Sequence, residues 1–129
     1  MPTDAAPQPK WMTVTGWILT VAPCAMLAMS ATMKFLRPPN LAEQFDKLGY
    51  PAGVWTPLGM VEATCTALFL LPPTRVLGAI LLTGYLGGAT ATHVRINDPW
   101  FMPVVLGVVV WLALFLRDAR LRALLPITR

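Results

Sequence analysis

The chain contains little charge. Among its 129 residues are 10 Lys or Arg and 6 Asp or Glu, so charged residues make up 12% of the sequence, whereas 56% of the residues are hydrophobic. Soluble globular domains carry about 25% charged residues. The composition therefore excludes an ordinary soluble fold, and the length predicts a single domain of an integral membrane protein.

Cysteine and histidine are also scarce. Only Cys24 and Cys65 are present and no CxxC motif occurs, which excludes a disulfide framework. We interpret both as small apolar core residues, with a redox pair at similar depth as the alternative. His93 is the single histidine, and without a second His or Cys at ligand spacing the sequence indicates no metal site. No glycine-rich phosphate loop is present, so no soluble nucleotide cofactor is indicated.

Basic residues give a net charge of +4, but they form no stripe interleaved with aromatic residues. Nucleic-acid binding is therefore not expected, and the positions of these residues at the ends of apolar runs suit lipid headgroups instead. One side of the membrane would carry Lys10, Arg75, Arg117, Arg120, Arg122 and Arg129. The other side would carry Lys34, Arg37, Lys47 and Arg95. This bias predicts a multi-pass protein with both termini in the cytoplasm.

Long hydrophobic runs are what the sequence has in place of charge. A membrane-spanning helix needs about 17–25 residues. Four runs approach this length, and they predict spanning helices over residues 12–33, 55–71, 75–94 and 100–116. The expected fold is thus an all-α four-helix bundle in the membrane. A polar tail (1–10) precedes the membrane domain (11–117), and a basic stub (118–129) follows it.

The connections between these runs differ in length. Short turns at 72–74 and 96–99 force neighbouring helices to run antiparallel, whereas the segment Arg37–Val54 is long enough to hold a helix of its own. Within that segment, apolar residues occur at helical spacing between charged ones, at Leu41, Phe45 and Leu48. The pattern predicts a short amphipathic helix that lies on the membrane surface or caps the bundle, ended by Gly49.

Two further patterns concern packing. Gly84 and Gly88 form a GxxxG motif in the third run, which predicts close approach of another helix of the same chain, with a homo-oligomer interface as the alternative. Tryptophans near the ends of the runs are interpreted as a belt at the membrane interface, namely Trp11, Trp17, Trp55 and Trp100.

Glu62 is the most unusual residue, because it is the only acidic residue in the apolar stretch Trp55–Leu71. A carboxylate among lipid tails costs a few kcal/mol, so Glu62 is expected to face the protein interior and to have a partner. Lys34, at the end of the first run, is the favoured partner, and Arg95 is the second. The pair could serve a binding site or could be a structural clamp between helices.

Antiparallel helices bring the unusual polar residues to one end of the bundle. Glu62 and His93 are candidate acid and base residues, and His93 could instead form an interfacial hydrogen bond or serve as a metal or haem ligand. Lys34, Tyr85 and Arg95 are candidate ligand-binding residues. All of them are predicted to lie in the outer leaflet.

The same residues carry a resemblance to a known family. The chain resembles the DoxX-like family of small four-span bacterial membrane proteins in the segments Leu48–Glu62, Leu70–Ala79 and Gly84–Pro99. Matching positions are Lys34, Glu62, Tyr85, Gly87, Gly88 and His93. The resemblance implies a four-helix bundle in the bacterial cytoplasmic (inner) membrane. It also implies a link to quinone-dependent redox systems, in which members are described as accessory subunits.

Two classes of function remain open. In the favoured one, the protein holds a lipid-soluble molecule of quinone or isoprenoid type beside Glu62, Tyr85 and His93, or supports a redox partner subunit. In the other, Glu62 and His93 act as acid and base in a membrane-embedded isomerase or cyclase. Apart from a quinone, no cofactor is indicated.

Overall fold

The structure, a computed structural model, describes residues 7–124, and every regular element in this range is helical. Parts of the predicted tail (1–10) and stub (118–129) therefore lie outside the described residues. Four long helices follow the predicted runs closely: α1 (Lys10–Leu36), α3 (Trp55–Leu70), α4 (Arg75–Arg95) and α5 (Phe101–Arg117). The shorter helices are α2 (Ala42–Leu48) and α6 (Ala119–Leu124), with 3-10 turns at Pro39–Leu41, Ala52–Val54 and Pro72–Thr74.

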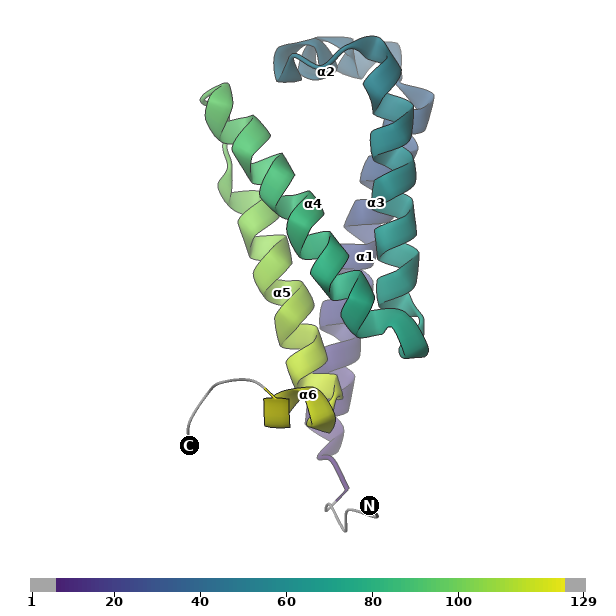
Figure 1. The fold of residues 1–129 in the computed structure, drawn as a ribbon, viewed down its shortest axis with the longest axis vertical. Coiled ribbons are helices and arrows are strands. Elements are labelled where there is room, and N and C mark those ends of the chain that lie inside the picture. The colour runs from purple at the N-terminus through teal and green to yellow at the C-terminus, as the bar shows by residue number, and fades with distance from the viewer. Residues whose placement is uncertain (1–6, 125–129) are drawn as a thin grey trace.

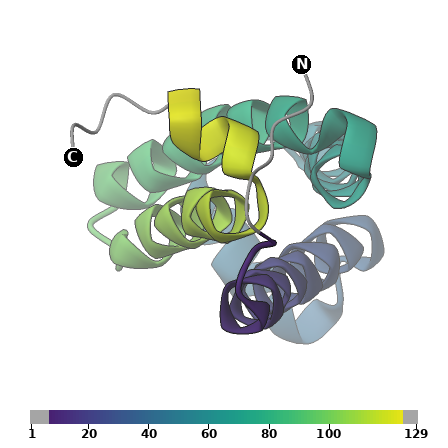
Figure 2. The same ribbon diagram turned by 90° about the horizontal axis from the view of Figure 1, so that it is seen from below.

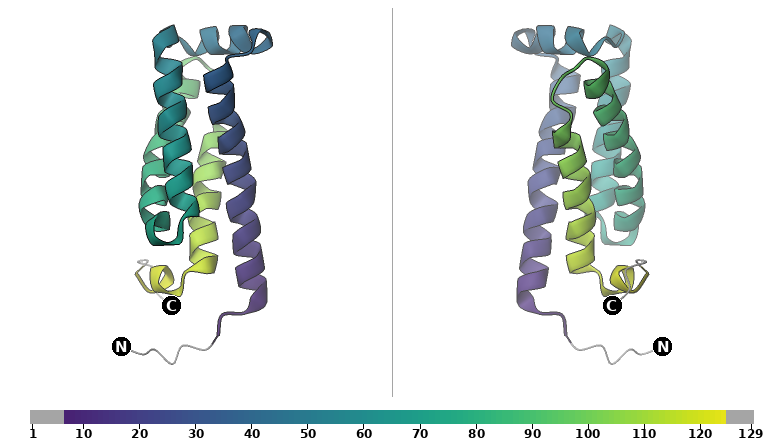
Figure 3. Two further views of the ribbon diagram at one scale, coloured as in Figure 1. Left: turned by 90° about the vertical axis from the view of Figure 1, so that its right-hand side faces the viewer. Right: turned by 90° about the vertical axis from the view of Figure 1, so that its left-hand side faces the viewer.

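The four long helices form a ring. Helix α1 contacts α3 and α5, and α4 contacts the same two helices from the opposite side (Figure 2). Neighbours in the chain run antiparallel, as predicted from the short turns. The start of α1 and helix α6 lie at one end of the bundle, here called the terminal end (Figure 3). The connections Arg37–Val54 and Ile96–Trp100 lie at the other, here called the loop end.

The apolar core holds the helices together and includes the fully buried residues Phe69, Leu82, Val110 and Leu114. Gly78 allows α4 to approach α3 just after the turn between them, because a Cβ at this position would overlap the backbone of Phe69. Cys24 and Cys65 both lie in this core and are free. Their surroundings agree with their interpretation as small apolar core residues.

Toward the loop end, the bundle widens. Figure 1 shows α4 leaning away from α3 in this direction, while α2 lies across the end. Helix α2 has the predicted amphipathic pattern: Leu41, Phe45 and Leu48 are half-buried, and Gly49 ends the helix with a left-handed φ of 77°. These bounds confirm the prediction of a short amphipathic helix in this segment, while its position on the membrane surface stays a prediction.

The outer surface of the bundle is unusually apolar. Large exposed side chains occur on every long helix, for example at Val14, Val61, Ile80 and Val108. Two helical segments, Lys10–Leu36 and Ala52–Leu70, are long and apolar enough to cross a membrane, and α5 is apolar but only 17 residues long. An all-helical fold with membrane-compatible helices is thus established, whereas four crossings remain a prediction.

Candidate ligand-binding site

The predicted partner of Glu62 is present. The Lys34 Nζ donates a hydrogen bond to the Glu62 Oε2 at 2.7 Å, and the same nitrogen donates to the Ser30 Oγ at 2.7 Å. Glu62 is 1% exposed, so its carboxylate lies within the protein and not among lipids. Helix periodicity explains the contact, because Ser30 lies one turn before Lys34 on the same face of α1. Arg95, the second predicted partner, is not bound to Glu62.

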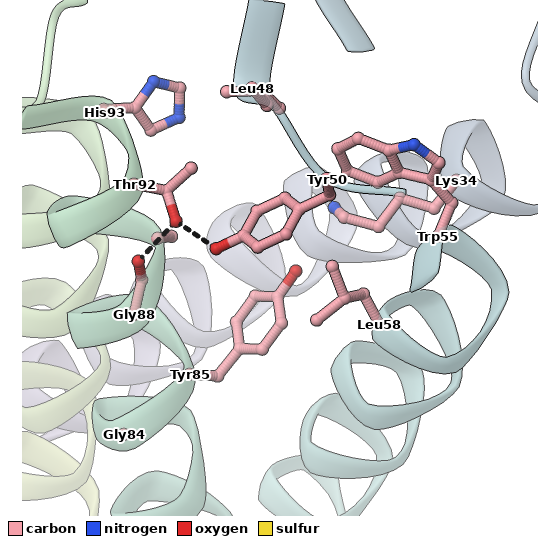
Figure 4. Close-up of a pocket in the computed structure, with 11 residues that line it drawn as sticks. Lys34, Leu48, Tyr50, Trp55, Leu58, Gly84, Tyr85, Gly88, Thr92 and His93 are labelled. Carbon is pink, nitrogen blue, oxygen red and sulfur yellow. Dashed lines mark hydrogen bonds between the residues drawn. The ribbon is translucent and has the colours of Figure 1, made fainter. Parts of the chain in front are cut away.

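A cavity of about 300 Å³ lies beside this pair, between α1, α3, α4 and the connection that precedes α3. Three of the predicted site residues line it: Lys34, Tyr85 and His93 (Figure 4). The remaining lining is mostly apolar or aromatic and consists of Leu48, Tyr50, Trp55, Leu58, Gly84, Gly88, Ala89 and Thr92. Glu62 and Arg95 are not among the lining residues, so they act on the cavity only through other side chains.

Lys34 is the charged group of the cavity wall. Its ammonium lies 5.9 Å from the centre of the Tyr85 ring, and its side chain is 14% exposed. An ammonium has three N–H donors, of which Ser30 and Glu62 accept two. One donor is left for a ligand atom. Glu62 therefore neutralises and orients a lysine that can donate a hydrogen bond into the cavity.

His93 was correctly placed at the loop end, but its partner was missed. The His93 Nδ1 lies 2.9 Å from the Asp98 Oδ2. The turn after α4 builds this pair: Asn97 takes a left-handed φ of 56°, and the Asp98 N–H donates to the His93 carbonyl at 2.9 Å. The pattern His-x4-Asp at the end of a helix is the sequence feature from which this pair could have been predicted. The structure does not bring His93 into contact with Glu62.

Arg95 holds in place the segment Leu48–Tyr50, which covers the cavity at the loop end. Its Nη2 donates to the Leu48 carbonyl at 2.5 Å, and its guanidinium lies 5.5 Å from the centre of the Tyr50 ring. The Tyr50 hydroxyl in turn lies 2.6 Å from the Thr92 Oγ1. Arg95 thus positions the roof of the cavity, while its predicted role in direct ligand binding has no support from the geometry.

Two aromatic residues of the cavity wall, Tyr50 and Trp55, were not predicted as site residues. Trp55, interpreted from the sequence as part of the interfacial belt, is 5% exposed, and its ring centre lies 4.6 Å from Phe45 and 5.7 Å from Tyr50. The belt interpretation of Trp55 is wrong, because α2 and the following connection fold back over its ring. Trp11, Trp17 and Trp100 are exposed, as a belt requires.

The glycine motif in α4 was also misinterpreted. A Cβ on Gly84, Gly87 or Gly88 would meet no atom within 4 Å, so no helix of this chain packs closely there. Gly84 and Gly88 line the cavity instead. The missing side chains create space for a ligand on this face of α4. The homo-oligomer interface stays a prediction.

The apolar exterior and the membrane-compatible helices together define a small helical membrane protein. The comparison with protein families agrees. Residues 18–115 match the model of the DoxX-like family, and the chain belongs to this family. No curated protein and no solved structure matches the chain.

Proposed function

We propose that this protein binds the head of a lipid-soluble molecule of quinone or isoprenoid type in the cavity lined by Lys34, Tyr50, Trp55 and Tyr85. The observation that supports it most is a mostly apolar, aromatic cavity with one oriented cation, which is the usual form of a small-molecule site. A volume of about 300 Å³ is at the small end for such sites, so an attached chain would lie outside, among lipids.

Between the two types, the cavity favours a quinone head. A quinone carbonyl can accept the free N–H of Lys34, and its flat ring can pack against the aromatic side chains of Tyr50, Trp55 and Tyr85. An isoprenoid hydrocarbon has no acceptor to match this donor. The role of an accessory subunit that presents such a molecule to a redox partner follows from the same binding site.

The enzyme alternative receives less support. An acid/base isomerase or cyclase would need Glu62 and His93 at the same substrate. Glu62 does not line the cavity and is bound to Lys34, whereas His93 is bound to Asp98. This arrangement favours a binding role, in which Glu62 orients the lysine.

The binding site is tested by filling it. Gly88→Leu should place a side chain in the cavity without striking the backbone, because a Cβ there meets no atom within 4 Å. Gly87→Leu is the matched control: its Cβ is equally free, but it lines a separate hollow between α4 and α5. We expect Gly88→Leu to weaken binding of decylubiquinone at least about 100-fold and Gly87→Leu to leave it unchanged.

Binding is measured by calorimetric titration of the purified protein in lipid nanodiscs, with empty nanodiscs as the blank. Mass spectrometry of the native, detergent-extracted protein should find a quinone with the wild type and none with Gly88→Leu. Equal affinities for both variants, or no binding of the probe to the wild type, would refute the proposed site.

We further propose that all four long helices cross the bacterial cytoplasmic membrane, with both termini in the cytoplasm. At 1.5 Å per residue, the 21 residues of α4 extend about 32 Å, which matches a hydrocarbon core of about 30 Å. Helix α5, with 17 residues, lies at the short end of the spanning range. The loop end, with the cavity, would then face the periplasm.

A cysteine at the loop end should react from outside the cell. Gln44 is exposed on α2, whereas the native cysteines are buried, so a membrane-impermeant maleimide should label Gln44→Cys in intact cells above the wild-type background. Arg120→Cys, at an exposed position of the terminal end, should label only after the inner face is opened. The reverse pattern would mean that the orientation is inverted.

A further inference from the structure

His93 separates two hollows at the loop end. It lines the cavity of the proposed site, and it also lines a second hollow between α2 and the turn after α4, together with Asp98 and Lys47. Its Nδ1 faces Asp98, and the opposite edge of the ring, which carries Nε2, points to the cavity side (Figure 4). Whether Nε2 is a hydrogen-bond donor or an acceptor therefore decides which ligand groups can bind to this part of the cavity wall.

Asp98 determines whether the His93 Nε2 is a donor or an acceptor. An ionised carboxylate accepts hydrogen bonds and cannot donate one, so the Nδ1 facing it must carry the proton. In the neutral imidazole, Nε2 then has a free lone pair and is an acceptor. Asp98 thereby fixes the tautomer of His93, as carboxylates do for histidines that bind metals or act as bases.

A second acceptor lies beside it. The Thr92 hydroxyl donates its one hydrogen to the Gly88 carbonyl at 2.9 Å, so the bond between Tyr50 and Thr92 uses the hydrogen of Tyr50. The Tyr50 oxygen is left able to accept only. The part of the wall formed by His93 and Tyr50 thus presents acceptors, whereas Lys34 on α1 and the Tyr85 hydroxyl can present donors.

We infer that the cavity selects a head group with an acceptor oxygen at one end and a hydroxyl at the other, and therefore binds a hydroquinone more tightly than the corresponding quinone. This inference rests on the proposed function and names the chemical form that the site prefers. The hydroquinone can accept from Lys34 and donate to the His93 Nε2. A quinone has only acceptors, so its second carbonyl would face a lone pair. No bond is made or broken in this selection.

The test compares decylubiquinol with decylubiquinone, which share size, ring substituents and tail, by calorimetric titration in nanodiscs without oxygen. The wild type should bind the quinol about tenfold more tightly, since one neutral hydrogen bond is gained. His93→Phe keeps a ring of similar shape without nitrogen and should abolish the preference while retaining affinity for the quinone. Asp98→Ala should reduce the preference severalfold because the tautomer is no longer fixed.

Lys47→Gln is the control for a general charge effect. Lys47 lines only the hollow on the Asp98 side, so its loss should leave the preference at its wild-type value. Equal binding of both probes by the wild type, or a preference that survives in both His93→Phe and Asp98→Ala, would overturn the inference while the binding function stands. Failure of the wild type to bind either probe would overturn both.

Discussion

Replacing Glu62 by glutamine is expected to lower the free energy of unfolding by about 3–5 kcal/mol, the largest single effect of a polar substitution in the bundle. The carboxylate is almost fully buried and pairs with the Lys34 Nζ at 2.7 Å. Without it, the ammonium has only the neutral glutamine oxygen and Ser30 as acceptors and lacks a counter-charge in a largely buried position. The loss is measured by titrating the protein from mild-detergent micelles into SDS and following helix content.

A double-mutant cycle separates the pair from its members. Lys34→Met removes the cation, and the double variant with Glu62→Gln leaves no unpaired charge. The loss of stability in the double variant should therefore be smaller than the sum of the two single losses by about 1–3 kcal/mol. Glu43→Gln on the exposed surface of α2 is the control, with an expected change within about 0.5 kcal/mol. Strictly additive losses for Glu62 and Lys34 would remove the pairing argument.

The positions of the helices and of the Glu62 pair could be predicted because their physical signals are strong and local. Apolar runs bounded by Lys, Arg or Pro set the ends of α1, α3, α4 and α5 to within a few residues. A carboxylate inside such a run needs a cation, and antiparallel order leaves few candidates at the same end. Lys34 and Arg95 remain after these two steps, and the favoured one, Lys34, is the partner in the structure.

A ligand site beside Glu62, Tyr85 and His93 could be predicted, and Tyr85 and His93 do line a cavity, but its shape and most of its lining could not, because they depend on how far α4 leans from α3. A GxxxG motif has the same appearance in sequence whether its missing side chains admit a helix or leave space, and at Gly84 and Gly88 they leave space. Trp55 has the position of an interfacial residue along the chain. Only the return of α2 over its ring makes it a wall of the site.

At the terminal end, replacing Asp118 by alanine should lower the free energy of unfolding by about 3 kcal/mol, near the lower limit for a buried pair because Arg75 is partly exposed. The Asp118 Oδ2 accepts from the Arg75 Nη2 at 2.9 Å, while Oδ1 accepts from the backbone N–H of Arg120 at 3.0 Å. One side chain therefore ties the start of α4 to the junction of α5 and α6.

Arg120→Ala is the matched control, because the Arg120 side chain is 87% exposed and lies 3.7 Å from the same carboxylate. Its expected change is within about 0.5 kcal/mol.

The contribution of Asp118 should also depend on pH. Burial raises the pKa of its carboxyl group, but the hydrogen bond and charge of Arg75 outweigh burial and hold the pKa below its ordinary value. A carboxyl group whose pKa is lower in the folded state stabilises the fold at pH values above its pKa in the unfolded chain, about 3.9. It loses this contribution as the pH falls through its pKa in the folded state. The stability difference between the wild type and Asp118→Ala, measured by the same SDS titration in buffers from neutral to acidic pH, should stay constant down to about pH 4 and shrink below it. The ion pair with Arg75 would not be the source of this stability difference if the difference disappeared already near neutral pH. The same conclusion would hold if it stayed unchanged at pH values well below the ordinary pKa of an aspartate.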